Sequence, residues 1–333
     1  MRGFIVVASY NEQFGNVDFY TISSLARKYA GSYDNWEGLE EWLYKEGFPY
    51  KHVIIDEGQD FALLPSKEEG DRNVEIIDEL REAALQSGGT FYLFYDRNQA
   101  IQGERNRTYD LPSYITDSDC RLTLYQNCRN TSAISQTSLT PLQLPQKRWN
   151  GSKVIDPWSV RVEKPVFHLL DDESLIVETV NKVLDDLQAK DVTDIVLLTV
   201  GTMAYTALRD GLEALDEGAD KYWYYCYKRK RYRMTTAQRF KGLEATAIIM
   251  VDLKPDSFAG KNGMVFYVGA SRAKLFLDFV AVIPEGEYKN VIQSVKETEP
   301  VNKSAKRLRN VIQDLFHAKV EDTRLSSVSE MNP

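Results

Sequence analysis

The chain has 333 residues, with 41 Lys and Arg against 49 Asp and Glu, and a formal net charge of −8. This acidic balance argues against nucleic-acid binding by bulk positive charge. No apolar run approaches the ~18 residues of a membrane span. Three cysteines without CxxC spacing exclude a disulfide framework. A hydrophobic fraction of 43% is enough for a packed core, and at roughly 100–200 residues per domain the length indicates two domains or one large one. We expect a cytoplasmic globular protein with no membrane partner.

Short apolar runs alternate with helical patterns in the first third of the chain. Two runs predict strands and two stretches predict helices: His52–Asp56, Phe91–Asp96, Glu37–Lys45 and Asn73–Gln86. Apolar strands separated by helices are typical of a parallel sheet covered on both faces. Asp56 and Asp96 end their strands, at the edge where such sheets bind ligands.

A second α/β pattern follows a connection over residues 137–165 that contains four prolines. Its predicted strands are Val166–Leu170, Asp194–Thr199 and Ala247–Asp252, and one further strand, Arg121–Tyr125, is predicted before the connection. Its predicted helices are Glu173–Gln188, Met203–Leu215 and much of Lys289–Lys319. We therefore place a first domain at 1–118, a second at 119–318 and a flexible tail at 319–333.

The longest basic cluster is Lys228–Arg231, followed by Arg233, with Tyr227 and Tyr232 interleaved. Cations among aromatic rings suit a single nucleic-acid strand, whose bases stack while its phosphates pair with the cations. The alternative interpretation is a solvated edge strand that charge protects from aggregation. Composition alone favours the second.

The string Asp56-Glu57-Gly58-Gln59-Asp60-Phe61 follows the first predicted buried strand. A carboxylate pair in this place is what nucleoside-triphosphate hydrolysis needs. The first carboxylate holds Mg²⁺ through water, and the second accepts a proton from the attacking water.

Further segments follow in a consistent order: Phe94–Ile101, Leu124–Thr131, Thr236–Glu244 and Tyr267–Lys274, with Val7–Asn11 and Phe19–Leu25 near the start. Together with the Asp-Glu string, they resemble motifs Ia to VI of the UvrD/Rep-type superfamily-one DNA helicases, over about residues 5–283. The resemblance implies an α/β protein with two RecA-like parallel-sheet domains of the P-loop NTPase type. The first domain would be incomplete at its N-terminus, and accessory subdomains would be minimal.

The resemblance also implies roles for individual residues. Asp56 would hold Mg²⁺, Glu57 would act in hydrolysis, and Gln99 would sense the γ-phosphate of ATP. Arg129 and Arg272 would reach the same phosphate from the second domain, as arginine fingers. The remaining implied contacts are Gln59, Gly242 and Glu244 to nucleotide, and Tyr10, Ser24, Gln238 and Lys241 to single-stranded DNA.

Several positions depart from the family pattern without removing a charged group. Gly58 stands where Ala is commoner, Cys128 where Tyr is, and Gln238 where His is. Gly269-Ala270-Ser271 replaces the usual Ala-Leu-Thr ahead of Arg272.

The sequence contains no G-x-x-x-x-G-K-[ST] phosphate loop, whose backbone and Lys would hold the phosphates. In the family this loop precedes motif Ia, so we expect it upstream of residue 1 or on a partner protein. The chain alone is then expected not to hydrolyse ATP. Two alternatives stay open: a non-catalytic, nucleic-acid-binding or regulatory pseudo-helicase, and a helicase-like subunit whose partner supplies the loop or a nuclease activity.

Overall fold

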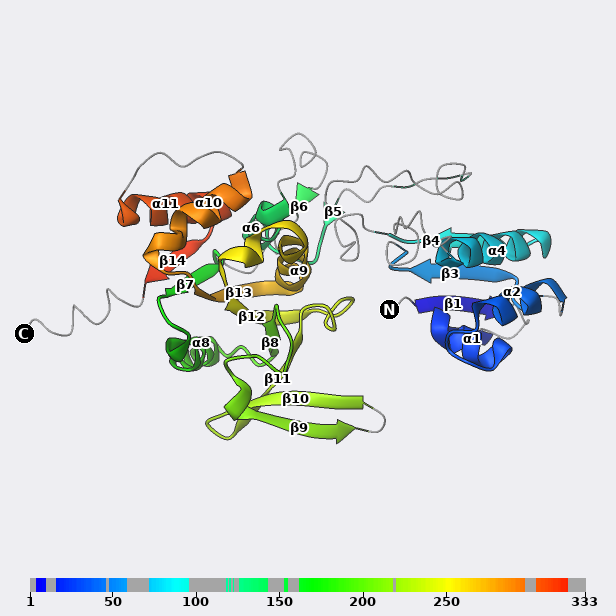
Figure 1. Cartoon of the computed structure of the whole chain (residues 1–333), viewed down its shortest axis with the longest axis horizontal. Helices are drawn as coiled ribbons and strands as arrows, with labels where there is room; N and C mark the ends of the chain where they lie inside the picture. The colour runs from blue at the N-terminus through cyan, green and yellow to red at the C-terminus, as the bar shows by residue number, and fades with distance from the viewer. Residues whose placement is uncertain are drawn as a thin grey trace, which may run out of the picture. The chain divides into compact units, whose positions relative to one another are not determined.

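The computed structural model describes residues 4–9, 16–45, 48–58, 72–95, 118, 120, 122, 126–142, 153–154, 162–217, 220–296 and 304–322. The chain divides into two compact units, Met1–Thr123 (unit 1) and Leu124–Pro333 (unit 2). Unit 1 has a four-stranded sheet, and unit 2 has an eight-stranded sheet and a two-stranded one (Figure 1). The sequence predicts this division a few residues earlier, at 118/119.

The elements of unit 1 are β1 (Phe4–Ser9), β2 (Asn16–Thr21), α1 (Ile22–Ala30), α2 (Trp36–Lys45), β3 (His52–Asp56), α4 (Arg72–Gln86) and β4 (Thr90–Leu93). The order of the sheet is β2-β1-β3-β4. Strands β3 and β4 are parallel, as expected, but β1 runs antiparallel to both β2 and β3. Residues 10–15 are too few for the crossover that parallel neighbours need, so β1 and β2 pair as antiparallel strands.

The core of unit 1 places α1, α2 and α4 against the strand that ends in Asp56. Val53 and Ile55 are fully buried among Leu25, Leu39 and Ile77. Helix α1 begins at a cap in which the Thr21 hydroxyl accepts from the backbone N–H of Ser24 (3.0 Å). These helices therefore bury the strand that carries Asp56 at its end.

The strands of unit 2 are β5 (Gln126–Asn127), β6 (Lys153–Val154), β7 (Val166–Leu170), β8 (Ile195–Thr199), β9 (Leu212–Glu217), β10 (Asp220–Tyr227), β11 (Lys230–Thr236), β12 (Ala245–Leu253), β13 (Ala273–Val282) and β14 (Lys319–Asp322). The α-helices are α6 (Ser132–Leu139), α8 (Ile176–Ala189), α9 (Gly260–Ala270), α10 (Tyr288–Lys296) and α11 (Ala305–Phe316). Short 3₁₀ turns are η2 (Thr140–Leu142), η3 (Glu173–Leu175), η4 (Arg209–Gly211), η5 (Pro255–Phe258) and η6 (Glu285–Glu287).

The large sheet has the order β14-β7-β13-β12-β8-β11-β10-β9. Six neighbouring strands, from β14 to β11, are parallel. The last two, β10 and β9, are antiparallel additions. The sheet is therefore mixed, and our expectation of a purely parallel sheet was too simple.

Helices cover both faces of this sheet, as the continuous apolar strands predicted. Helix α8 lies on one side, and α6, α9, α10 and α11 lie on the other (Figure 1). All five residues of β8 are buried. Phe167 and Phe279 stack at 4.3 Å between ring centroids on the side of the four helices.

Two predicted elements of unit 2 were wrong. Residues 203–215 form turns, η4 and the start of β9 instead of a helix. Strand pairing outweighs helical periodicity here, because β9 pairs with β10. Gly211 precedes β9 and packs closely against β10, since a Cβ at this position would lie 2.5 Å from the Tyr225 ring. Residues 319–322 are not a flexible tail either, because β14 pairs in parallel with β7.

The other predicted elements agree with the structure within a few residues at their ends. The long C-terminal helical stretch is two helices, α10 and α11, and the residues between them include Pro300. The predicted strand Arg121–Tyr125 lies outside the described residues except for Leu122. In the part of the chain that the structure describes, no helix has the length and apolar character of a membrane span.

Candidate functional site

The carboxylate pair of unit 1 lies where β3 ends. Asp56 is exposed, and its Oδ1 accepts from the backbone N–H of Glu57 (2.9 Å). Glu57 has a φ of 55°, in the left-handed region that non-glycine residues rarely adopt. The backbone N–H of Gly58 donates to the Phe94 carbonyl (2.8 Å), so the residue that follows β4 anchors the turn.

Gly58 allows this close approach to β4. A Cβ at this position would lie 2.4 Å from Leu93 Cδ1 and 3.2 Å from the Phe94 carbonyl oxygen. A side chain at this position would therefore require Leu93 to shift.

Three predicted site residues, Tyr10, Gln59 and Gln99, lie outside the described residues. Ser24 is half-buried in the first turn of α1, where its hydroxyl donates to the Thr21 carbonyl (2.8 Å). This hydroxyl is thus bonded to the backbone of the residue that caps the helix, and a contact with a DNA strand would compete with that bond.

In unit 2, an asparagine organises the turn that carries Arg129. Asn127 Oδ1 accepts from the backbone N–H groups of Arg129 (3.0 Å) and Asn130 (3.2 Å). Its Nδ2 donates to Asn130 Oδ1 (3.1 Å). This Asx-type turn precedes Thr131, which caps α6. Arg129 and Cys128 are both exposed on the turn.

Arg129, Glu244 and Lys274 form one ionic cluster, although they lie far apart along the chain. Arg129 Nε donates to Glu244 Oε2 (3.2 Å), and Lys274 Nζ donates to Glu244 Oε1 (3.3 Å). The side chains are 41%, 46% and 38% exposed, respectively. The segments that resemble motifs IV, V and VI therefore meet at the beginning of β12 and β13.

The segment before Glu244 is a compact turn after β11. Phe240, which is buried, donates its N–H to the Thr236 carbonyl (3.1 Å). Gly242 has a φ of +82°, where glycine avoids the strain that a side chain would bring. Gln238, Gly242 and Glu244 are exposed and Lys241 is half-buried, so the turn presents polar groups to solvent.

Arg272 lies close in sequence to this cluster but in a different environment. It is 1% exposed, and its Nε donates to the Val268 carbonyl (3.0 Å). Asn130 Nδ2 lies 2.9 Å from the Ser271 carbonyl oxygen and 2.5 Å from the Ala273 carbonyl oxygen, the two that flank Arg272. The turn after α9 is thus held by the residue next to Arg129.

The Gly-Ala-Ser sequence ahead of Arg272 also has a packing reason. A Cβ on Gly269 would lie 2.8 Å from Met250 Cε and 3.1 Å from Ala237 Cβ. The absence of a side chain lets α9 approach β12 closely, and this approach contributes to the burial of the turn.

The basic cluster forms the tip of the β10–β11 hairpin, with Lys228 and Arg229 as its two-residue turn at φ of 45° and 63°. Lys228 Nζ lies 2.8 Å from both carboxylate oxygens of Asp185, Lys230 donates to Gln188 and Arg231 to Glu213. The bond with Lys228 lowers the pKa of the Asp185 carboxyl. The cations are thus bonded to side chains within unit 2. The edge-strand interpretation was wrong, because β11 lies between β8 and β10 and the sheet ends at β9.

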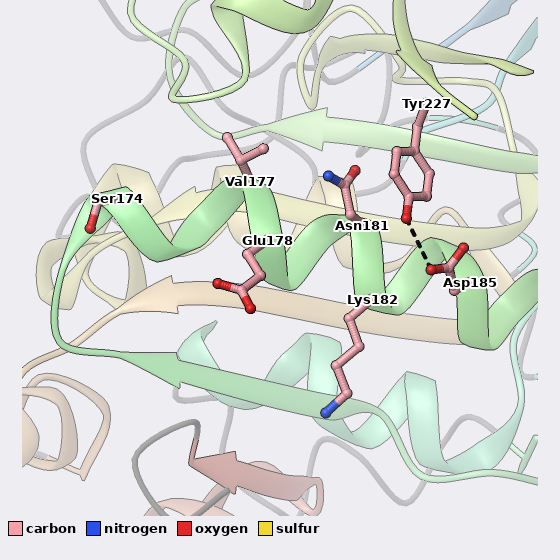
Figure 2. A pocket seen from close by; sticks show the side chains of 7 residues that line it. All are labelled: Ser174, Val177, Glu178, Asn181, Lys182, Asp185 and Tyr227. Carbon is pink, nitrogen blue, oxygen red and sulfur yellow. Dashed lines mark hydrogen bonds between the residues drawn. The ribbon is translucent and has the colours of Figure 1, made fainter. Parts of the chain in front are cut away.

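A surface pocket of about 590 Å³ lies beside this hairpin, along the exposed face of α8 (Figure 2). Its lining residues are Ser174, Val177, Glu178, Asn181, Lys182, Asp185 and Tyr227. The Tyr227 hydroxyl donates to Asp185 across one end (3.0 Å). None of the residues that carry the helicase resemblance lines this pocket.

A Mg²⁺ ion at the end of β3 would be bound by few protein ligands. Among the residues that the structure describes, no three His, Cys, Asp or Glu side chains gather as a metal site. Mg²⁺ that binds with a nucleotide needs only one or two carboxylates, because phosphate and water complete its shell. The exposed carboxylate of Asp56 fits that requirement.

Sequence reasoning missed Lys274 of the ionic cluster, and Asn127 and Asn130, which hold the turns that carry Arg129 and Arg272. All three lie inside the motif-like segments, which was the available signal, but only the fold brings them together. No protein-family model matches the sequence, and no curated protein is found to be similar to it.

Proposed function

We propose that this chain is the core, or a fragment, of a UvrD-like DNA helicase that couples ATP hydrolysis to movement along single-stranded DNA. One observation supports this most: three short segments with the family's motif residues, from Arg129 to Lys274, converge on one ionic cluster in unit 2. Chance matches scattered along a sequence have no physical reason to meet in this way.

The proposed division of labour takes for each residue the role that the motif resemblance implies. Asp56, at the end of β3, would hold Mg²⁺, and Glu57 would accept a proton from water. Arg129, exposed on its turn, would neutralise the transferring phosphate. A bound ATP–Mg²⁺ complex would supply the phosphoryl group. Because the sequence has no phosphate loop, we propose that hydrolysis needs that loop from elsewhere.

The second candidate, a non-catalytic pseudo-helicase that binds or regulates nucleic acid, is favoured by a specific observation. Arg272 is buried and bonded to the end of α9, which is a structural role. An arginine finger must instead reach a phosphate, so this guanidinium would have to leave its buried position.

The experiment measures the binding of a fluorescent, non-hydrolysable ATP analogue with Mg²⁺, with and without a poly-dT oligonucleotide. We expect nucleotide to change the DNA affinity, because a motor couples its two ligands. We expect Arg129→Ala to weaken nucleotide binding by roughly tenfold, the scale of one charge-assisted bond. Arg307→Ala on α11, another exposed arginine, is the control and should have no effect.

The two candidates differ in outcome. DNA binding that nucleotide does not affect would support the pseudo-helicase. Equal nucleotide affinity in wild type and Arg129→Ala would contradict the proposed nucleotide site. Phosphate release at turnovers per second by this chain alone would refute the expectation that it needs an external phosphate loop.

A further inference from the structure

Glu244 carries two cations, one on each carboxylate oxygen. Arg129 Nε donates to Oε2 and Lys274 Nζ to Oε1, at 3.2 and 3.3 Å. Neither the composition nor the motif resemblance assigns a role to Lys274. Arg129 alone could neutralise the Glu244 carboxylate, so the second cation, Lys274, needs a separate explanation.

The three residues are attached to the fold in different ways. Ala245 and Ala273 are register partners on β12 and β13, and the Ala245 N–H donates to the Arg272 carbonyl (3.1 Å). Glu244 directly precedes β12 and Lys274 lies on β13, so both adjoin this pair. Arg129 lies on the turn that Asn127 holds, and its side chain, 41% exposed, extends from that turn to Glu244. Its guanidinium can therefore change partners by a change of side-chain rotamer, without a movement of the backbone.

An anion that approaches the cluster competes with Glu244 for Arg129. If Arg129 were the only cation on Glu244, its departure would leave a carboxylate with no counter-charge beside the incoming anion. Two like charges in such proximity repel each other. With Lys274 on the other oxygen, Glu244 keeps a counter-ion after Arg129 has left.

We propose that Lys274 is a positioning residue that neutralises Glu244, so that Arg129 can transfer from Glu244 to a phosphate group. Glu244 then serves as the resting partner of Arg129. The inference rests on the proposed function to the extent that the incoming anion is a polyphosphate. It does not require that the chain hydrolyses ATP or moves along DNA.

The test is a double-mutant cycle on the full chain, with inorganic tripolyphosphate as the probe and calorimetry as the readout. We expect Lys274→Gln to weaken tripolyphosphate binding by about two- to fivefold, the range that exposed ion pairs support. Lys274→Arg, which keeps the charge, should bind like wild type. Glu244→Gln should bind more tightly, because Arg129 then has no anionic partner to leave.

The decisive measurement is Lys274→Gln in the Glu244→Gln background, where the substitution should have no effect. An equal loss in both backgrounds would show that Lys274 contacts the anion itself, and would overturn the proposal. An unchanged affinity in Lys274→Gln, or no tripolyphosphate binding by the wild type, would also overturn it. Unfolding curves for every variant exclude a loss of fold.

This test and that of the proposed function fail separately. The cycle needs neither DNA nor a nucleoside, so it can succeed even if nucleotide and DNA binding prove uncoupled. If the two ligands are coupled but the cycle shows no interaction between Lys274 and Glu244, the helicase proposal stands and this inference fails.

Discussion

Arg129 and Arg272 have the same implied role but opposite environments. Arg129 lies on an exposed turn, with Glu244 as an ionic partner and 41% of its side chain accessible. Arg272 is 1% exposed and bonds the carbonyl of Val268, in the last turn of α9. A buried guanidinium has lost its water, so its bonds to the protein must replace that hydration. The Arg272 side chain is therefore part of the packed interior, whereas the Arg129 side chain lies at the surface, where a ligand can contact it.

The comparison separates two meanings of a motif match. A residue type at the expected position can supply a reacting group or hold the scaffold, and burial distinguishes these roles better than sequence spacing does. Asn130 links the two regions, because it follows Arg129 directly and bonds the carbonyls on both sides of Arg272.

The largest expected effect is on stability at Arg272. Replacing this buried side chain with Ala leaves a cavity and removes the bond to Val268, so we expect a loss of about 3 kcal/mol in the free energy of unfolding. Chemical denaturation followed by circular dichroism measures it. Arg129→Ala is the matched control and should cost less than about 1 kcal/mol, as exposed ion pairs do. Equal losses of unfolding free energy for Arg272→Ala and Arg129→Ala would contradict the inferred difference between a structural and an exposed arginine.

Asn130→Ala should have an intermediate effect. The substitution takes a buried donor from two backbone carbonyls, and we expect a loss of about 2 kcal/mol. Hydrogen exchange should also accelerate at the Ala245 amide, which donates to Arg272 in the same turn. Asn262→Ala, an exposed asparagine bonded to the Asp256 carbonyl, is the control and should change stability by less than about 0.5 kcal/mol. An unchanged exchange rate at the Ala245 amide would show that Asn130 does not stabilise the turn that contains Arg272.

The smallest effect is expected at Gly269. A Cβ there crowds Met250 and Ala237, and the flexible end of Met250 can yield in part, so Gly269→Ala should cost about 1 kcal/mol. Gly286→Ala is the control, because no atom lies within 4 Å of its added Cβ. Thermal unfolding of both variants measures the difference. If Gly269→Ala were as stable as Gly286→Ala, close packing of α9 would not explain the burial of Arg272.

Most of the α/β elements could be predicted because their signal is local. Runs such as His52–Asp56 and Val166–Leu170 are apolar over a strand's length and became β3 and β7. The stretch 203–215 failed because its periodicity is that of a helix, whereas its structure depends on pairing with a strand further along the chain. Whether a strand runs parallel or antiparallel is likewise decided by which neighbour it meets, as β1 shows.

The sequence by itself determined the alternation of buried strands and helices and the motif-like segments, because apolar periodicity and residue order are local properties. Tertiary structure alone decided which motif residues are presented and which are buried. It set Arg129 beside Glu244 across 115 positions of sequence separation and enclosed Arg272 between α9 and β13. The physical reason is that burial and charge pairing depend on the neighbours that packing brings together, and residues distant in the chain supply those neighbours.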